Sequence, residues 1–399
     1  MASEIRHWML GRPSSTKLLY AARAIRGLAD GFAVIILPAY LTELGFTPFQ
    51  VGIVATAALL GTAVMTLGVG YLASRHDLRN LLLVGAGVMS ATGAVFATIG
   101  SAGVALLPLF ASIAFVGTAN PSSGDIGIFV PLDHAMLARD ATDVDRTRVF
   151  ARYSLVGGLS AAVGALGATM PSLLTATGMG RLAALQAMFY LYGLLGLVAL
   201  AVYRRLPQLQ TPTADEQHVQ PPLGPSRGIV YRLAALFSLD AFAGGFAVQS
   251  LVALWLFERF DMSLGAASVF FFWSNTLAAF SFPVAARLAK RLGLVNTMVF
   301  THIPSSVCLI LAAFLPDLTG VLTLLLIRAA LSQMDVPTRT SYVMAIVRPA
   351  ERPAAASVTA VPRSLASSIS PTLAGALLST AFSGLPLVIC GALKIVYDV

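Results

Sequence analysis

The segment RRLPQLQTPTADEQHVQPPLGPSR, residues 204–227, divides the chain into two parts of similar character. It is rich in proline, glutamine and threonine and has no apolar periodicity, which is typical of a flexible linker. Six apolar runs precede it and six follow it, most of them long enough to cross a membrane. They cover residues 18–41, 49–72, 80–100, 104–136, 152–175 and 182–203, then 230–256, 264–288, 294–315, 318–345, 356–380 and 385–399. We expect two bundles, residues 1–203 and 230–399, joined by a linker at 204–229.

The composition places the chain in a membrane. Of the 399 residues, 57% are hydrophobic and 11% are charged, whereas soluble domains average about 45–50% apolar and about 25% charged residues. This excludes a soluble enzyme and a soluble nucleic-acid binder. We expect an all-α integral membrane protein with twelve transmembrane helices in a lipid bilayer.

The basic residues lie mainly on one side of the expected membrane. With the N-terminus in the cytoplasm, only Arg181 and Arg259 of the loop cations fall on the outer side. Because loops rich in Lys and Arg stay in the cytoplasm, we expect both termini to be cytoplasmic and the protein to reside in the cell membrane. The same asymmetry accounts for the net charge of +8 without a nucleic-acid partner.

The two parts of the chain also resemble one another. The matched residues lie in corresponding loops and spans. They include Thr47 with Ser263, Leu72 with Leu288, Arg75 with Arg291, Asn80 with Asn296, Asp125 with Asp335 and Ser154 with Ser364. Duplicated halves joined by a polar linker are typical of secondary transporters, in which the substrate site lies between the halves near the bilayer midplane.

The loop GYLASRHDLRN, residues 70–80, carries a family resemblance. It is similar to the pattern Gly-x-Leu-Ala-Asp-Arg-x-Gly-Arg of the major facilitator superfamily. The residues in register are Gly70, Leu72, Ala73, Arg75 and Arg79. The loop departs from the pattern at Ser74, which replaces the acidic residue, and at Asp77, which replaces the glycine.

A second copy of this loop, RLAKRLG at residues 287–293, contains Arg291 and also lacks the acidic residue. The resemblance covers the whole chain and implies two pseudo-symmetric six-helix bundles. In the family this loop contacts neighbouring helix ends and stabilises one conformation. The resemblance therefore implies a gating role for Gly70, Arg75, Arg79 and Arg291.

A glycine motif bears on the direction of transport. Exporters of this family often carry Gly-Pro-x-x-Gly-Gly in the fifth span. Here the fifth span, SLVGGLSAAVGALGATMP, has only the glycine pairs, and Ser370-Pro371-x-x-Ala374-Gly375 stands in span eleven. This resemblance suggests antiport.

Span one contains three ionisable residues on one helical face. Arg23, Arg26 and Asp30 follow at i, i+3 and i+7, and Asp30 falls close to mid-membrane. A charge there costs about 2.5–3.5 kcal/mol on insertion scales. One interpretation is an ion pair between Asp30 and Arg26 that lets the helix insert. The other is that Asp30 takes up a proton when the cavity opens to one side.

Spans four and ten carry matched polar interruptions, which point to a transport site. Irregular backbone at membrane depth is tolerated only where it lines a cavity or is buried in protein. We expect substrate-binding residues at Asn120, Asp125, Arg328, Gln333 and Arg339. For proton coupling we expect Asp335 to pair with Arg328 or Arg339. The alternative is a structural kink whose charges lock the two halves together.

Spans seven and eight add three polar candidates for substrate binding, namely Asp240, Gln249 and Asn275. Two other polar residues are given structural roles. We expect Asp133, near the cytoplasmic end of span four, at an interface, and His302, alone in span nine, as a satisfied core residue.

The inventory of motifs excludes direct chemistry. The five histidines are scattered one per segment, and HExxH, GxSxG and Walker A motifs are absent. We therefore expect no enzyme activity, no cofactor and no metal site. Transport then draws its energy from an ion or substrate gradient.

The function that these observations favour is secondary active transport. We expect a monomer that exports a small organic compound in exchange for protons or another coupling ion, by alternating access between its halves. Burial disfavours a charged carboxylate and a nearby arginine favours it, so alternating the two environments binds and releases a proton. The alternatives are an importer of a small anionic metabolite and a membrane receptor with the same fold.

Overall fold

The computed structural model describes residues 15–73, 75–99, 106–122, 127–140, 143–208, 224–348 and 351–399. Within these ranges all regular secondary structure is helical, which confirms the predicted all-α class. In chain order the α-helices are α2 (Ser15–Glu43), α3 (Pro48–Leu72), α4 (Leu78–Ile99), α5 (Leu107–Val116), α6 (Phe129–Asp140), α7 (Asp143–Leu166), α8 (Met170–Ala176), α9 (Arg181–Tyr203), α10 (Arg227–Gly245), α11 (Gln249–Phe260), α12 (Leu264–Leu292), α13 (Leu294–Phe314), α14 (Leu318–Ser332), α15 (Asp335–Ile346), α16 (Arg352–Leu378) and α17 (Leu385–Asp398).

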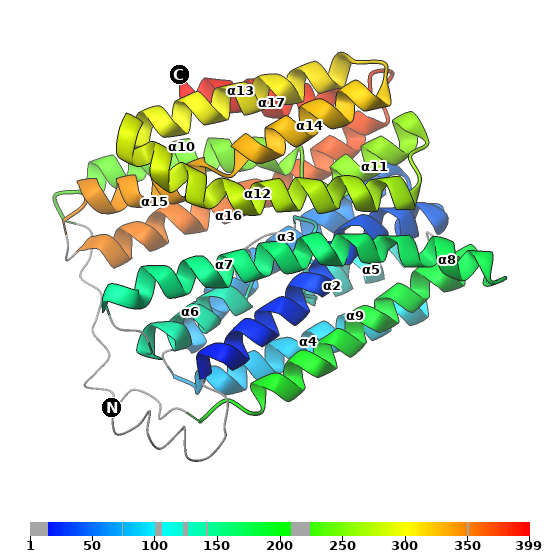
Figure 1. Ribbon diagram of the computed structural model, residues 1–399, viewed down its shortest axis with the longest axis horizontal. Coiled ribbons are helices and arrows are strands. Elements are labelled where there is room, and N and C mark those ends of the chain that lie inside the picture. Colours follow the sequence, from blue (N-terminus) through cyan, green and yellow to red (C-terminus); the bar gives the residue numbers. More distant parts are fainter. Residues whose placement is uncertain are drawn as a thin grey trace.

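The helices run roughly along the long axis of the molecule (Figure 1), with α2–α9 in its lower part and α10–α17 in its upper part. We call the end where α9 finishes at Tyr203 and α10 begins at Arg227 the linker end. The opposite end, where α2 finishes at Glu43 and α3 begins at Pro48, is the far end.

The surface of the bundle is suited to lipid. Within the described residues, eight helical segments are long and apolar enough to cross a membrane. Large apolar side chains on their outer faces are exposed, among them Leu194, Phe300 and Phe314. Many exposed apolar side chains on membrane-length helices are stable in a bilayer and unfavourable in water.

Two helices begin at positions that the internal repeat pairs. Thr47 caps α3, where its side chain accepts a hydrogen bond from the Gln50 backbone N–H and the Gln50 side chain accepts one from the Thr47 backbone. Ser263 caps α12 by accepting a hydrogen bond from the Ala266 N–H. Capping satisfies N–H groups that a helix start leaves without partners. The repeat thus places equivalent helix starts at the far end in both parts of the chain.

The expected interruptions of spans four and ten are present. Helix α5 ends at Val116, because Gly117 leaves the helical path with φ −75° and ψ 171°, and α6 begins at Phe129. Helices α14 and α15 are separated by Gln333 and Met334. The structure has a third break, between Gly245 and Gln249 in span seven, which the sequence did not predict.

The two parts of the molecule are in close contact at the far end, where α3 packs against α16. A Cβ atom on Gly52 would collide with the Pro371 carbonyl oxygen, and one on Gly375 would collide with the Pro48 carbonyl oxygen. These glycines are therefore required for the approach of the two backbones.

A hydrogen bond across the same contact joins the two parts. The Thr56 hydroxyl oxygen accepts from the Thr372 hydroxyl at 2.7 Å and from the Thr372 backbone N–H at 3.0 Å. Helices α7 and α12 form a further contact, in which a Cβ on Gly158 would lie 3.0 Å from the Ala279 side chain.

Candidate functional site

A pocket lies between α2, α3, α4, α9 and the irregular segment that joins α5 to α6. Its lining residues all belong to the first part of the chain. They are Arg23, Arg26, Asp30, Thr62, Met65, Met89, Gly117, Thr118, Gly127, Ile128, Phe129, Val130 and Tyr192. We call it the Asp30 pocket.

Asp30 is the acidic group in the lining of this pocket and is partly accessible. Its carboxylate accepts a hydrogen bond from the Tyr192 hydroxyl, and Arg23 and Arg26 are close enough to act on it electrostatically. The Tyr192 hydroxyl also lies 3.2 Å from that of Thr118. A carboxylate that combines access to a pocket with nearby cations can hold or release a proton with little rearrangement.

Arg26, expected as the partner of Asp30, forms its ion pair with Asp133 and acts on Asp30 only electrostatically. The Arg26 Nη2 atom lies 2.5 Å from Asp133 Oδ2, and both side chains are almost fully buried. Arg26 also donates to the Tyr153 hydroxyl at 3.1 Å, which in turn donates to Asp133 at 2.6 Å. Tyr203 donates to the other Asp133 oxygen at 3.3 Å. Asp133 thus neutralises Arg26 inside the first bundle.

Arg23 occupies a space that a glycine provides. Its guanidinium carbon lies 5.2 Å from the centre of the Tyr153 ring, and a Cβ on Gly157 would collide with the guanidinium. Neither Tyr153 nor Gly157 was among the residues selected from the sequence. An aromatic and a glycine in an apolar span give no signal of their own until the fold places them beside a cation.

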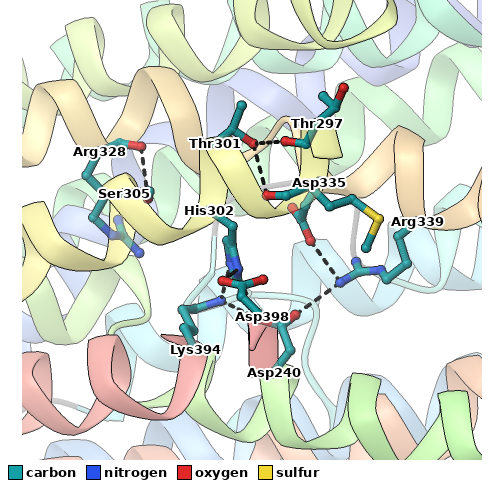
Figure 2. A network of polar contacts seen from close by, with 11 residues as sticks. Asp240, Thr297, Thr301, His302, Ser305, Arg328, Asp335, Arg339, Lys394 and Asp398 are labelled. Carbon is teal, nitrogen blue, oxygen red and sulfur yellow. Dashed lines mark hydrogen bonds and ion pairs between the residues drawn. The ribbon is translucent and has the colours of Figure 1, made fainter. Parts of the chain in front are cut away.

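A second cluster of charges joins α10, α13, α15 and α17 (Figure 2). Arg339 donates to Asp240 Oδ2 and to Asp335 Oδ2, at 3.0 Å in each case. Of the two partners expected for Asp335, Arg339 is therefore the one that the structure brings to it. Asp240, expected as a substrate ligand, is committed to this cluster and is buried.

The same cluster contains three residues that the sequence expectations gave no functional role. Lys394 donates to Asp240 Oδ1 at 2.6 Å. His302 Nδ1 lies 2.8 Å from Asp398, and its Nε2 lies 3.1 Å from the Lys394 ammonium. Since an ammonium only donates, Nε2 accepts and Nδ1–H donates to Asp398. His302 is thus a member of an ionic network. The signal that could have found it is its position, because an ionisable residue in an apolar span is by itself a sign of function.

The other expected substrate ligands lie near the helix breaks. Asn120 accepts a hydrogen bond from the Ser122 backbone N–H at 2.9 Å, and Gln249 donates to Asn275 at 2.8 Å. The Ser250 backbone N–H donates to the Pro121 carbonyl oxygen at 3.1 Å, so the breaks of spans four and seven touch. Gln333 is the C-cap of α14. Asp125 lies outside the described residues.

The expected gating residues lie at the linker end. Arg75 stacks on the Tyr71 ring at 4.4 Å, and Arg79 donates to the Arg204 carbonyl oxygen at 2.7 Å. Gly70 has open space around its Cα, and Arg291 lies in the last turn of α12. Arg79 thereby ties the start of α4 to the end of α9.

Comparison with known sequences yields a family and a distant relative. The family model for the Major Facilitator Superfamily matches residues 19–371. An uncharacterized membrane protein of Saccharomyces cerevisiae is 23% identical over 417 residues, which cover 96% of this chain and 92% of the yeast protein.

Solved structures share the fold. A point variant of the nucleoside transporter NupG aligns with TM-score 0.74 and 14% identity over 96% of this chain and 98% of NupG. The inward-open form of the xylose transporter XylE from E. coli aligns with TM-score 0.74 and 13% identity over 96% and 95% of the two chains. Likeness at such identities shows the twelve-helix transporter fold alone. Because the family model spans most of the sequence, this chain belongs to the Major Facilitator Superfamily.

Proposed function

We propose that this protein is a proton-coupled transporter that exports a small organic compound from the cell. Residues 1–203 and 230–399 form the two halves that rock against each other, and residues 204–229 link them on the cytoplasmic side, where both termini lie. The protein works as a monomer in the cell membrane. The family, the apolar surface and the far-end contact between the two parts of the chain support this proposal.

The observation that carries the proposal is the different surroundings of Asp30 and Asp133. Asp133 is saturated by Arg26 and two tyrosines and has no access to solvent. Asp30 lines the pocket and keeps accessible surface. Since a proton must reach its site from the aqueous phase, Asp30 is the proton acceptor in the first bundle.

A shared pocket leads to exchange rather than cotransport. The substrate enters the Asp30 pocket when the two halves move apart, and the pocket walls combine apolar side chains (Met65, Met89) with the hydroxyls of Thr62 and Thr118. Such a lining suits an organic compound with an apolar body and few polar groups. When substrate and proton compete for one site, each enters as the other leaves, and protons moving inward drive the substrate out.

The charge cluster of α10 and α15 provides a second proton-coupling pair, Asp335 with Arg339. Arg339 bridges two carboxylates, so protonation of Asp335 leaves the arginine paired with Asp240. Loss of the Arg339–Asp335 contact then costs less free energy than leaving the buried Arg339 charge without any partner. Arg339 therefore keeps a buried partner when Asp335 serves as the second proton-coupling residue.

Flux measurements in proteoliposomes test the proposal. Purified protein is reconstituted, and a panel of labelled organic compounds is followed with and without an imposed pH gradient. We expect movement of the substrate against its own gradient, in the direction opposite to the proton flow. Absence of gradient-dependent flux for every compound would contradict the proposal.

A second candidate function is the uptake of a small organic anion. The pocket lining holds Arg23, Arg26 and the acidic Asp30, and Asp133 outside the lining already neutralises Arg26. Protonation of Asp30 then leaves the pocket more positive, which favours binding an anion together with the proton. The same vesicles separate the two functions, because uptake predicts accumulation of anions in the direction of the proton flow.

A further inference from the structure

Arg328 of α14 is a cation inside the second bundle that lies apart from the acidic residues. In Figure 2 it stands on one side of His302, while Asp335 and Arg339 stand on the other. Its carbonyl oxygen accepts from the Ser305 hydroxyl at 3.5 Å. Within the described residues its guanidinium forms no ion pair with a carboxylate, and the charged or polar groups that act on it are the thiols of Cys308 and Cys390. Of the two partners expected for Asp335, Arg328 is the one that lies apart from it, since Arg339 forms the ion pair.

An arginine in this position needs an acceptor. The guanidinium has five N–H donors, accepts no hydrogen bond and stays charged in proteins. Placing an arginine at the centre of a membrane helix costs about 2.5–3.5 kcal/mol on insertion scales. Asp240 and Asp335 do not offset this cost, because Arg339 and Lys394 already occupy them.

The surroundings of Arg328 supply further donors. The neighbouring helix α13 presents Ser306, whose hydroxyl is buried and has no hydrogen-bond partner. Helix α17 presents the buried thiol of Cys390. The two helices approach closely at Gly391, where a Cβ would lie 2.7 Å from the Ser306 carbonyl oxygen. Ser306 and Cys390 therefore lie at the close contact of α13 with α17, and the thiol of Cys390 is near enough to act on the Arg328 guanidinium.

We propose that Arg328 and the Ser306 hydroxyl bind a small monovalent anion, such as chloride, between α13, α14 and α17. A charged acceptor satisfies both donors at once, and charge-assisted hydrogen bonds are about twice as strong as neutral ones. The close approach of α13 and α17 favours a compact ion over a large one. Arg328 is only partly buried, so an ion can reach it. The site is separate from the Asp30 pocket, which lies in the first bundle.

Binding is measured on the purified full-length protein in detergent, where no proton gradient exists. Labelled chloride is titrated at constant ionic strength, with gluconate as the replacing anion. The midpoint of thermal unfolding is recorded in the same series. We expect saturable binding and a rise of the midpoint by about 2 °C or more in chloride, because a ligand of the folded state stabilises it.

Two variants assign the site, and a third controls for the loss of an exposed positive charge. Arg328→Gln and Ser306→Ala should each weaken chloride binding, the first by about tenfold or more. Arg287→Gln, which changes an exposed arginine of α12, should bind chloride like the wild type. Ser306→Ala keeps the test decisive if Arg328→Gln does not fold.

The source of the anion is resolved by competition. Displacement of chloride by a small carboxylate such as formate or lactate identifies the site as one for an anionic group of the substrate. Binding that these carboxylates leave unchanged identifies a resident ion. Equal midpoints in chloride and gluconate, or equal binding by wild type and both variants, would overturn the proposal. Neither result bears on Asp30, whose role is tested by proton-driven flux.

Discussion

At the scale of single residues, the sequence shows which side chains are ionisable inside the membrane but not how they pair. Helical spacing places Arg26 and Asp30 on one face of α2, which made them the obvious pair. The ion-pair partner of Arg26 is instead Asp133, which comes from α6, 107 residues further along the chain. Pairing depends on how α2 and α6 pack, and helical periodicity carries no information on that.

Asp30→Asn tests the role of the accessible carboxylate. The variant keeps the shape and the hydrogen bond to Tyr192 but cannot ionise. We expect flux driven by a pH gradient to fall at least tenfold, while substrate exchange at equal pH on both sides persists. Both are measured in proteoliposomes. If gradient-driven flux equals that of the wild type, Asp30 is not the coupling site.

Asp133→Asn tests the buried ion pair. Removal of one partner leaves Arg26 charged and unpaired, and this should lower the free energy of unfolding by about 3–5 kcal/mol. The double variant Arg26→Met with Asp133→Leu removes both charges and should recover most of the loss. Thermal unfolding in detergent compares them. A single variant as stable as the wild type would show that the pair contributes nothing.

At the scale of elements, the helix breaks differ in how visible they are in the sequence. The interruption of span four follows from Asn120 and Pro121, and that of span ten from the polar run that includes Gln333 and Asp335. The break of span seven gives only Gly244 and Gly245 as a signal. Glycine pairs also occur in continuous helices, as at Gly157 and Gly158 of α7. The Gly244–Gly245 pair differs because the break beside it contacts the break of span four. This is a tertiary contact, which the sequence alone does not reveal.

Gly375→Ala tests the close contact between α3 and α16. The added methyl group collides with the Pro48 carbonyl oxygen, and overpacking of this kind typically costs about 1–3 kcal/mol. We expect the far end to open more often. In purified protein carrying Thr56→Cys, the rate of maleimide labelling should rise about tenfold.

The control for this variant lies in the same pair of helices. Gly68 of α3 has open space around it, so Gly68→Ala adds the same methyl group without a collision. It should label at the rate of the Thr56→Cys parent. Equal rates for Gly375→Ala and Gly68→Ala would mean that the glycine contact does not hold the far end closed.

At the scale of the whole molecule, hydropathy and the repeat were sufficient for the fold class, because membrane helices follow from the length of apolar runs. The ionic network of the second bundle was harder to predict from the sequence. Two of its members, Lys394 and Asp398, stand at the end of the last span. They become part of a network only when α17 packs against α10 and α13.

A crosslink between the two parts of the chain tests whether transport needs the far end to open. Thr56 and Thr372 belong to α3 and α16, and their hydroxyl oxygens are 2.7 Å apart. A disulfide between Thr56→Cys and Thr372→Cys requires only a small adjustment of these side chains. Alternating access cannot proceed if the halves stay joined there. We expect oxidation to abolish flux in vesicles and reduction to restore it. The single-cysteine variants retain Cys308 and Cys390, so the same oxidant applied to them controls for the native thiols. Full flux with the crosslink formed, as verified by gel mobility, would show that the far-end contact stays closed throughout the cycle.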